Sequence, residues 1–162
     1  LVNNAGITRD APLHKMSLEN WEKGINVNLN SVFNLTSLTI NKMRDNGFGR
    51  IIHISSVNGQ KGQFGQTNYA ATKSALIGFS KSLALESASK GITSNVICPG
   101  YINTEMVAAI REDILKGIID TIPSKRLGES KEIAEMVDYL VSEKASYVNG
   151  ATFSINGGLW MD

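Results

Sequence analysis

Tyr69 and Lys73 are the two residues whose types and spacing most directly suggest chemistry. Four residues apart on a helix, a phenol and an ammonium share one face about one turn apart. A nearby positive charge lowers a tyrosine pKa from its usual value of about 10, because it favours the phenolate. A tyrosine tuned in this way can exchange a proton near neutral pH, which suits general acid–base catalysis. Such pairs also arise by chance on solvated helices, so the assignment depends on other residues.

Ser56, Asn28 and a loop rich in glycine and glutamine support the assignment. Ser56 follows a short apolar run, where its hydroxyl could bond a substrate oxygen. Asn28 lies among apolar helical neighbours, where a buried amide needs a partner. It could hold a water or a helix carbonyl, or make a structural hydrogen bond in the core. The loop leaves room for a substrate and supplies neutral polar groups from Gly59, Gly62, Gly65, Gln60, Gln63 and Gln66.

Alternating strands and helices must position these residues. Short apolar runs predict buried strands at residues 1–4, 50–55, 92–98 and 151–155. Helical spacing predicts helices from an N-cap at Ser17 to about residue 43, over 68–90, in two pieces over about 104–120, and from an N-cap at Ser130 to about 141. Residues 57–67 and 123–129 have the composition of loops. This alternation predicts an α/β fold, with helices on both faces of a parallel sheet.

The carboxyl ends of three predicted strands carry small or polar residues. These segments are Asn3-Asn4-Ala5-Gly6, Ser55-Ser56 and Pro99-Gly100-Tyr101. Ligands bind outside the carboxyl ends of the strands in open parallel sheets. Each segment alone could be an ordinary turn, but their coincidence at three strand ends predicts one shared crevice.

Composition limits the classes of protein to which the chain could belong. Its 162 residues are 42% hydrophobic and 19% charged, which is typical of one folded domain. A net charge of +1 gives no electrostatic reason to expect nucleic acid or an anionic membrane as a partner. The single cysteine, Cys98, allows no intrachain disulfide, and we expect it to be buried and the protein to be cytoplasmic. We expect no metal site, and we expect His14 and His53 to be structural or exposed.

Five motifs in this order resemble those of the short-chain dehydrogenase/reductase family: N-N-A-G, N-x-N-x-x-S, I-S-S, Y-x-x-x-K and P-G. The resemblance extends from Asn3 to Gly158, and it implies the C-terminal portion of a Rossmann-type doubly wound parallel sheet. It also implies that Tyr69 protonates a substrate carbonyl that receives hydride from a nicotinamide, and that Ser56 orients this carbonyl. Lys73 would lower the pKa of Tyr69 and bind the nicotinamide ribose, and Asn28 would hold a water linking the lysine to solvent.

The resemblance further implies which residues meet the cofactor, NADP(H), and the substrate. The cofactor residues would be Asn4, Ala5, Gly6, Ile7, Thr8, Tyr69, Lys73, Pro99, Gly100, Tyr101, Ile102 and Thr104. The substrate residues would be Asp10, Ser56, Gln63, Phe64, Gly65, Gln66, Tyr69 and Tyr101. Asp10 could instead be a solvated loop carboxylate, and Tyr101 could serve only in packing.

Within that family, "NNAGITRD", "GFSKSLALE" and "GITSNVICPGYINTEM" resemble the 3-oxoacyl-thioester reductases. The stretch "SSVNGQKGQFGQTNY" is similar, more narrowly, to the acetoacetyl-CoA reductases of polyhydroxybutyrate synthesis. The resemblance implies NADPH-dependent reduction of acetoacetyl-CoA to (R)-3-hydroxybutyryl-CoA. The alternative is a reductase of acyl-carrier-protein thioesters in fatty acid biosynthesis.

The family binds the cofactor pyrophosphate with a G-x-x-x-G-x-G turn that precedes the N-N-A-G motif. This turn does not occur in the sequence. We therefore expect residues 1–162 to be a single partial domain that by itself is inactive and binds no NADPH measurably. A further alternative is a remnant that serves at most as an oligomerisation module. The resemblance also implies a homotetramer, with helix 68–90 at one interface and the C-terminal segment at another.

Overall fold

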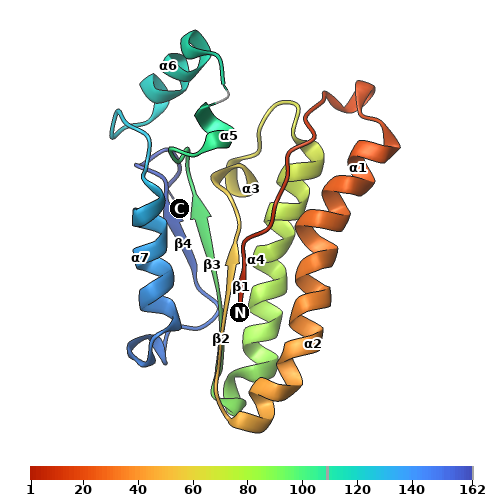
Figure 1. Ribbon diagram of the computed structural model, residues 1–162, viewed down its shortest axis with the longest axis vertical. Helices are drawn as coiled ribbons and strands as arrows, with labels where there is room; N and C mark the ends of the chain where they lie inside the picture. Colours follow the sequence, from red (N-terminus) through yellow and green to blue (C-terminus); the bar gives the residue numbers. More distant parts are fainter. Residues whose placement is uncertain (109, 162) are drawn as a thin grey trace.

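A parallel β-sheet forms the centre of the computed structural model, which describes residues 1–108 and 110–161 (Figure 1). Within these residues the sheet has four strands, in the spatial order β1 (Val2–Asn3), β2 (Gly49–Ile54), β3 (Ile92–Pro99) and β4 (Thr152–Ile155). In the register of the sheet, Val2 pairs with Ile52, Ile52 with Asn95, and Val96 with Thr152. The predicted α/β class with a Rossmann-type parallel sheet is confirmed.

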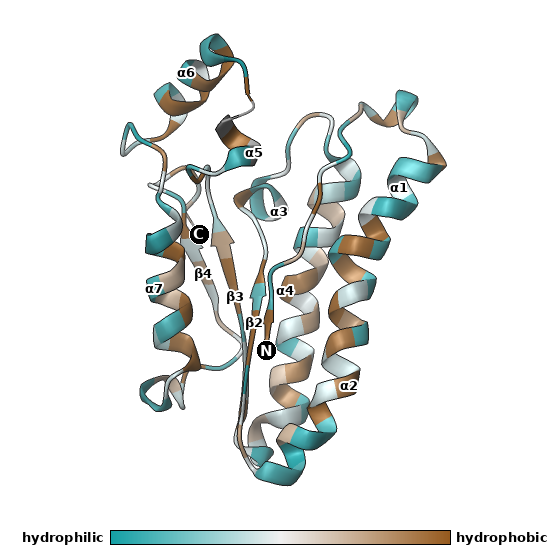
Figure 2. Ribbon diagram, in the orientation of Figure 1, coloured by the Kyte–Doolittle hydropathy of each residue, from teal (hydrophilic) through white to brown (hydrophobic). Residues whose placement is uncertain are grey.

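Helices cover both faces of this sheet, because neighbouring residues on a strand point to opposite sides. Ile52 and Ile97 pack with Leu140 of α7 (Ser130–Val141) on one face. Ile51 and Ile92 pack on the other face, against α4 (Thr67–Ser87) and α2 (Ser31–Asn46). Figure 2 shows hydrophobic residues along β3, α2 and α7. The sheet is therefore doubly wound, as predicted.

The helix predicted from Ser17 onward is interrupted by a π-helical turn. Ser17 caps α1 (Leu18–Ile25) by accepting a hydrogen bond of 3.2 Å from the backbone N–H of Asn20. The segment η2 (Asn26–Asn30) is a π-helix, and α2 follows it directly. The periodicity of the sequence did not indicate this turn, which holds the buried Asn28.

The stretch predicted as a loop after β2 begins with a short helix, α3 (Val57–Lys61). Ser56 is its N-cap, and its hydroxyl accepts a hydrogen bond of 3.1 Å from the backbone N–H of Asn58. The prediction of a loop is therefore wrong for these residues, because a serine cap and packing against α4 outweigh the glycine- and glutamine-rich composition. The loop resumes at Gly62, which has a φ of 74°.

Short helices lie beyond the carboxyl ends of the strands, at the edge of the sheet where α3 also lies (Figure 1). They are α5 (Glu105–Ala108) and α6 (Glu112–Thr121). The N-cap of α7 is Glu129 rather than the predicted Ser130. The backbone N–H of Glu129 donates to the Glu132 carboxylate at 2.8 Å. The remaining elements are the short helices η1 (Leu13–Lys15), η3 (Ala88–Lys90) and η4 (Glu143–Ala145).

Candidate active site

A pocket of about 230 Å³ lies at the carboxyl edge of the sheet and joins segments that are distant in the sequence. Two of the three strand ends predicted to share a crevice contribute Ser56, Gly100 and Tyr101 to it, whereas none of the residues from Asn3 to Gly6 lines it. The loop after β1 contributes Thr8 and Asp10. Its full lining is Thr8, Asp10, Ser56, Val57, Asn58, Gln66, Tyr69, Gly100, Tyr101, Val107 and Ile110.

Tyr69 lines this pocket together with Ser56. Burial raises the pKa of Tyr69 above its ordinary value, while the hydrogen bond from Ser56 acts to lower that pKa and the Asp10 carboxylate acts to raise it. The sequence predicted the opposite direction, on the assumption that the Lys73 ammonium would dominate. Desolvation is the largest cause of the shift, and the phenol therefore keeps its proton near neutral pH.

Lys73 lies one turn along α4 and is almost fully buried. Its Nζ donates a 2.7 Å hydrogen bond to the carbonyl of Ile54 at the end of β2, and lies 5.7 Å from the centre of the Tyr69 ring. Burial lowers the pKa of Lys73 to about 8. Of the predicted pair, the lysine is therefore the group whose proton exchanges closest to neutral pH.

Asn28 fixes the chain that enters the site from β1. Its Oδ1 accepts from the backbone N–H of Ile7 at 2.8 Å, and its Nδ2 donates to the carbonyl of Ile7 at 3.0 Å. The same Nδ2 lies 3.3 Å from the hydroxyl of Thr72 on α4. The side chain thus makes a structural hydrogen bond in the core, one of the two roles left open by the sequence, and the bond is to the neighbouring loop.

Gly6 faces the buried lysine from the other side of the site. A Cβ at this position would lie 3.2 Å from Lys73 Nζ and 3.6 Å from Asn28 Oδ1. Asn4 and Ala5 precede it as exposed residues at the end of β1. A side chain at position 6 would therefore crowd the lysine ammonium.

The other residues predicted to meet the cofactor follow β3. Pro99 is the last residue of that strand. Ile102 is buried and pairs with Gly128 in an isolated bridge. Thr104 is exposed, and its hydroxyl donates to the carbonyl of Ile102 at 3.3 Å. None of these three lines the pocket that holds Tyr69.

The predicted substrate residues divide into two groups. Asp10 and Gln66 meet in the pocket, where Gln66 Nε2 donates to Asp10 Oδ2 at 2.8 Å. Gln63 instead accepts a 2.9 Å hydrogen bond from Lys61, and both line a neighbouring cavity of about 440 Å³ beside α6. Phe64 is 87% exposed.

The backbone conformation at position 65 favours glycine. Gly65 has a φ of 77°, in the left-handed region that favours glycine, and its carbonyl accepts from the N–H of Ala11 at 2.8 Å. This bond joins the glutamine-rich loop to the loop that carries Asp10. Gln60 points elsewhere, since its amide donates to the Ser154 hydroxyl on β4 at 2.9 Å.

Asn58 is the polar wall residue that sequence reasoning missed. It is 8% exposed and makes hydrogen bonds from its backbone to Ser56 and from its side chain to Gln66. The signal available in the sequence was the serine two residues earlier, in the spacing of a helix cap. Val57, Val107 and Ile110 supply the apolar part of the wall.

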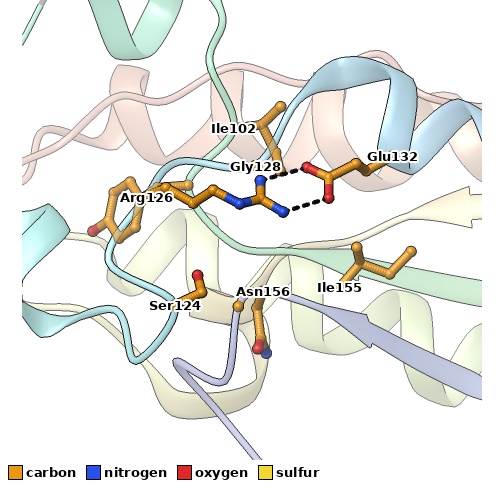
Figure 3. Close-up of a pocket in the computed structure, with 9 residues that line it drawn as sticks. Ile102, Ser124, Arg126, Gly128, Glu132, Ile155 and Asn156 are labelled. Atoms are coloured by element: carbon orange, nitrogen blue, oxygen red, sulfur yellow. Dashed lines mark hydrogen bonds and ion pairs between the residues drawn. The ribbon is translucent and has the colours of Figure 1, made fainter.

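A second, smaller cavity of about 130 Å³ lies between the segment after β3 and the turn after β4 (Figure 3). Its polar wall is the pair of Arg126 and Glu132, joined by hydrogen bonds of 2.7 and 2.8 Å. The arginine lowers the pKa of Glu132 to about 2. A carboxylate held in this state cannot act as a general acid or base near neutral pH, and the cavity holds none of the predicted catalytic residues. Tyr101 forms part of the wall of both cavities.

The two histidines and the cysteine lie outside the pocket that holds Tyr69. His14 is exposed, whereas His53 and Cys98 are buried in the sheet. Within residues 1–108 and 110–161, no group of three histidine, cysteine or acidic residues is placed to hold a metal ion. In the same part of the chain, none of the helices combines the length and apolar character needed to cross a membrane.

Comparison with known proteins places these features in one group of enzymes. A family model described as enoyl-(acyl carrier protein) reductase matches residues 1–160. Nodulation protein G of Azospirillum brasilense is 58% identical over 159 residues, which are 98% of this chain and 65% of the relative. Acetoacetyl-CoA reductase of Cupriavidus necator is 55% identical over 161 residues, or 99% of this chain and 65% of the relative.

A third relative is the 3-oxoacyl-[acyl-carrier-protein] reductase of Salmonella typhimurium. It is 51% identical over 161 residues, which cover 99% of this chain and 66% of the relative. The chain therefore spans just under two thirds of the length of the curated relatives that it matches.

Proposed function

The chain belongs to the short-chain dehydrogenase/reductase family, and on that premise we propose that it carries the catalytic part of an NADPH-dependent 3-oxoacyl-thioester reductase. The preferred reaction is the reduction of acetoacetyl-CoA to (R)-3-hydroxybutyryl-CoA. The observation that carries this proposal is the meeting of Ser56 and Tyr69 with Asp10 and Gln66 in one pocket, with Lys73 buried beside it.

The side chains of this pocket have distinct roles in the proposed reaction. Ser56 donates its hydroxyl proton in a hydrogen bond to the C3 carbonyl oxygen and so orients it. Tyr69, whose pKa is raised by burial, gives its proton to the same oxygen as the carbonyl is reduced. Lys73, with a pKa of about 8, would pass a proton back toward Tyr69. Val57 and Ile110 exclude water from the acyl end of the pocket.

A nicotinamide dinucleotide would supply the hydride when bound. Lys73 would bind its ribose beside Gly6, where a Cβ would lie only 3.2 Å from the lysine Nζ. Asn4, Ala5, Ile7 and Thr8 would flank the cofactor on one side. On the other side, Pro99, Gly100, Tyr101, Ile102 and Thr104 would follow the end of β3. We propose NADP(H) rather than NAD(H), in keeping with the acetoacetyl-CoA reductases that the chain resembles.

A second candidate is a reductase of 3-oxoacyl thioesters carried by acyl carrier protein. It is favoured by the 51% identity to the Salmonella typhimurium reductase, whose name states that substrate. Steady-state kinetics of the intact protein with acetoacetyl-CoA and with the carrier-protein thioester separate the two. A clearly higher kcat/KM for the CoA thioester supports the first candidate, and the reverse order supports the second.

We also propose a homotetramer in the cytoplasm. The groove between α2 and α4 supports self-association, because it is lined in part by Phe33, Ile40 and Phe79. A buried single cysteine, Cys98, suits a reducing compartment.

Replacement of Tyr69 by phenylalanine tests the proposed proton donor. The change removes one hydroxyl from the pocket, so turnover of the intact enzyme should fall by roughly 10²- to 10⁴-fold, the range typical of a lost general acid. NADPH affinity, measured by fluorescence titration, should change little.

The matched control is Tyr139→Phe, which alters a partly exposed tyrosine on α7. It should leave turnover at the wild-type level. Near-normal turnover of Tyr69→Phe would refute the assignment of the acid.

A further inference from the structure

A cavity of about 750 Å³ lies at the amino end of β2 and β3, at the opposite end of the sheet from α3 and α5 (Figure 1). Its walls come from the turn before β2, the segment that enters β3 and the turn after η4. Among the residues that line it are Phe48, Arg50, Thr93, Glu143, Ser146 and Tyr147. The cavity shares no lining residue with the pocket that holds Tyr69, so it is separate from the candidate active site.

Arg50 brings a buried positive charge to this cavity. The residue is only 7% exposed. Its Nη1 donates to the carbonyls of Gly49 and Gly91 at 2.8 and 3.1 Å, and its Nε donates to the carbonyl of Ser142 at 3.3 Å. These three acceptors hold the guanidinium in one orientation. They are neutral, so they satisfy hydrogen-bond donors without balancing the charge.

No carboxylate of the described residues balances this charge. None of the ion pairs among residues 1–108 and 110–161 includes Arg50. Glu143 lines the cavity, but it is exposed and its carboxylate forms no ion pair in the same part of the chain. The Phe48 ring, whose centre lies 4.5 Å from the guanidinium carbon, gives a favourable but weaker contact. Because buried charges in proteins are paired as a rule, this guanidinium favours an added anion.

Two donors remain for such an anion. The Nη2 of Arg50 makes no hydrogen bond to a described residue. Thr93 pairs with Arg50 in the register of the sheet, so the two side chains lie on the same face. Thr93 is 4% exposed, and its Oγ1 is buried without a partner among the described residues. Buried polar atoms without a partner are rare and require an explanation, which a ligand oxygen at this place supplies.

We propose that this cavity binds a small organic carboxylate, whose oxygens accept hydrogen bonds from Arg50 Nη2 and the Thr93 hydroxyl. The planar guanidinium matches the geometry of a carboxylate. The cavity is much larger than one carboxylate group, and the exposed rings of Phe48 and Tyr147 offer apolar surface to the rest of the ligand. Glu143 in the wall repels a dianion such as phosphate more strongly than a monoanion.

Benzoate and benzamide are the matched probes for this site, because they are similar in size and shape and only benzoate is an anion. In isothermal titration calorimetry of the intact protein at low salt, benzoate should bind with saturation. Benzamide should bind about tenfold more weakly or worse, as expected for the loss of a hydrogen bond to a charged group. Equal affinity for the two probes, or tighter binding of inorganic phosphate than of benzoate, would overturn the assignment of a carboxylate.

Thr93→Val tests whether benzoate binds in this cavity. Valine keeps the shape of threonine without the hydroxyl, so the affinity for benzoate should fall by about tenfold. The ligand-free variant should melt at an unchanged or higher temperature, because a buried hydroxyl without a partner is removed. Thr152→Val is the matched control, since Thr152 Oγ1 is also buried without a partner among the described residues but lies on β4, outside the lining of the cavity. It should bind benzoate as the wild type does.

Variants of the two charged residues test the sign of the site. Glu143→Gln should tighten benzoate binding by about twofold, because it removes a like charge at an exposed position. Arg50→Met should abolish saturable binding, and if that variant does not fold, Thr93→Val and the two probes still decide. Wild-type affinity in Thr93→Val, or no saturable binding of benzoate by the wild type, would refute the site. These readouts need no turnover, so their failure leaves the proposed function intact.

Discussion

His53 illustrates how one side chain outside the pocket can set the pH range over which the fold is stable. Its Nδ1 lies 3.2 Å from Asn3 Nδ2, which can only donate, so the proton of the neutral ring is on Nε2. That nitrogen lies 3.2 Å from the Ser94 hydroxyl, which in turn lies 2.9 Å from that of Ser80. Burial, with a smaller contribution from the N-terminal charge, lowers the pKa of His53 to about 4.

Acid should therefore destabilise the protein through His53. The unfolded histidine binds a proton near pH 6.5 and the folded one only near pH 4, so this contribution is fully present above pH 6.5 and is lost as the pH falls toward 4. The loss amounts to about 3 kcal/mol. In His53→Asn, urea unfolding between pH 4 and 7 should show a correspondingly weaker dependence on pH.

The exposed histidine offers the matched control for this measurement. His14→Asn should retain the pH dependence of the wild type, because His14 is exposed. An unchanged acid response in His53→Asn would show that another group is responsible.

At the scale of elements, α3 packs closely against α4 beside Lys73, and Ser55, just before α3, donates a 2.7 Å hydrogen bond to the Lys73 carbonyl. A Cβ on Gly59 would lie 2.9 Å from both the carbonyl carbon and the Cβ of Lys73. The two helices can approach this closely only because position 59 has no side chain.

Gly59→Ala should therefore push α3 away from Lys73. We expect a loss of about 1–3 kcal/mol in the free energy of unfolding, as for other overpacked contacts, together with a lower kcat. Gly117→Ala on α6 is the matched control, since a Cβ there meets nothing within 4 Å. That change should leave stability unaltered or raise it by up to about 1 kcal/mol. Equal stability of the two variants, measured by chemical denaturation, would contradict the packing argument.

The sequence predicted those elements whose signals are local. Apolar runs marked the strands, Ser17 marked the start of α1, and the small residues at strand ends marked the crevice. The π turn around Asn28 and the helix α3 were missed, because each depends on a partner that is distant in the chain. The direction of the Tyr69 pKa shift was also missed, because it follows from burial, which helical spacing does not reveal.

The placement of the substrate loop was predicted only in part. Gln66 reaches the pocket as expected, whereas Gln63 turns toward Lys61 and Phe64 toward solvent. The turn at Phe64 and Gly65, closed by a 3.1 Å hydrogen bond from the Gln66 N–H to the Gln63 carbonyl, decides which side chains face inward, and composition alone does not specify it.

At the scale of the whole molecule, apolar side chains remain exposed along the helices on one face of the sheet. Phe33 is 61% exposed and Leu38 80% exposed on α2, and Leu85 is 86% exposed on α4. Phe33 also lines the groove of about 510 Å³ between these two helices. Large exposed apolar groups of this kind are typical of surfaces that associate.

Phe33→Lys should weaken the proposed tetramer by placing a charge in the groove. Light scattering coupled to size-exclusion chromatography should give the mass of four copies for the intact wild type and a smaller assembly for the variant. Leu13→Lys, at a 64% exposed position on η1, is the control and should keep the wild-type mass. A full-sized assembly in Phe33→Lys would place the interface elsewhere.

The π turn at Asn26–Asn30 also has a consequence at the level of the gene. A π turn is equivalent to one residue inserted into an α-helix, and here Ser31 N–H reaches back to the carbonyl of Asn26. Deleting a single codon from this stretch would restore a regular helix and rotate everything on one side by about 100° relative to the other. Either Asn28 would then lose its hydrogen bonds to the backbone of Ile7, or the side of α2 that lines the groove would turn away from α4. The number of codons between Ser17 and Gly47 is thus as much a constraint on this fold as their identity.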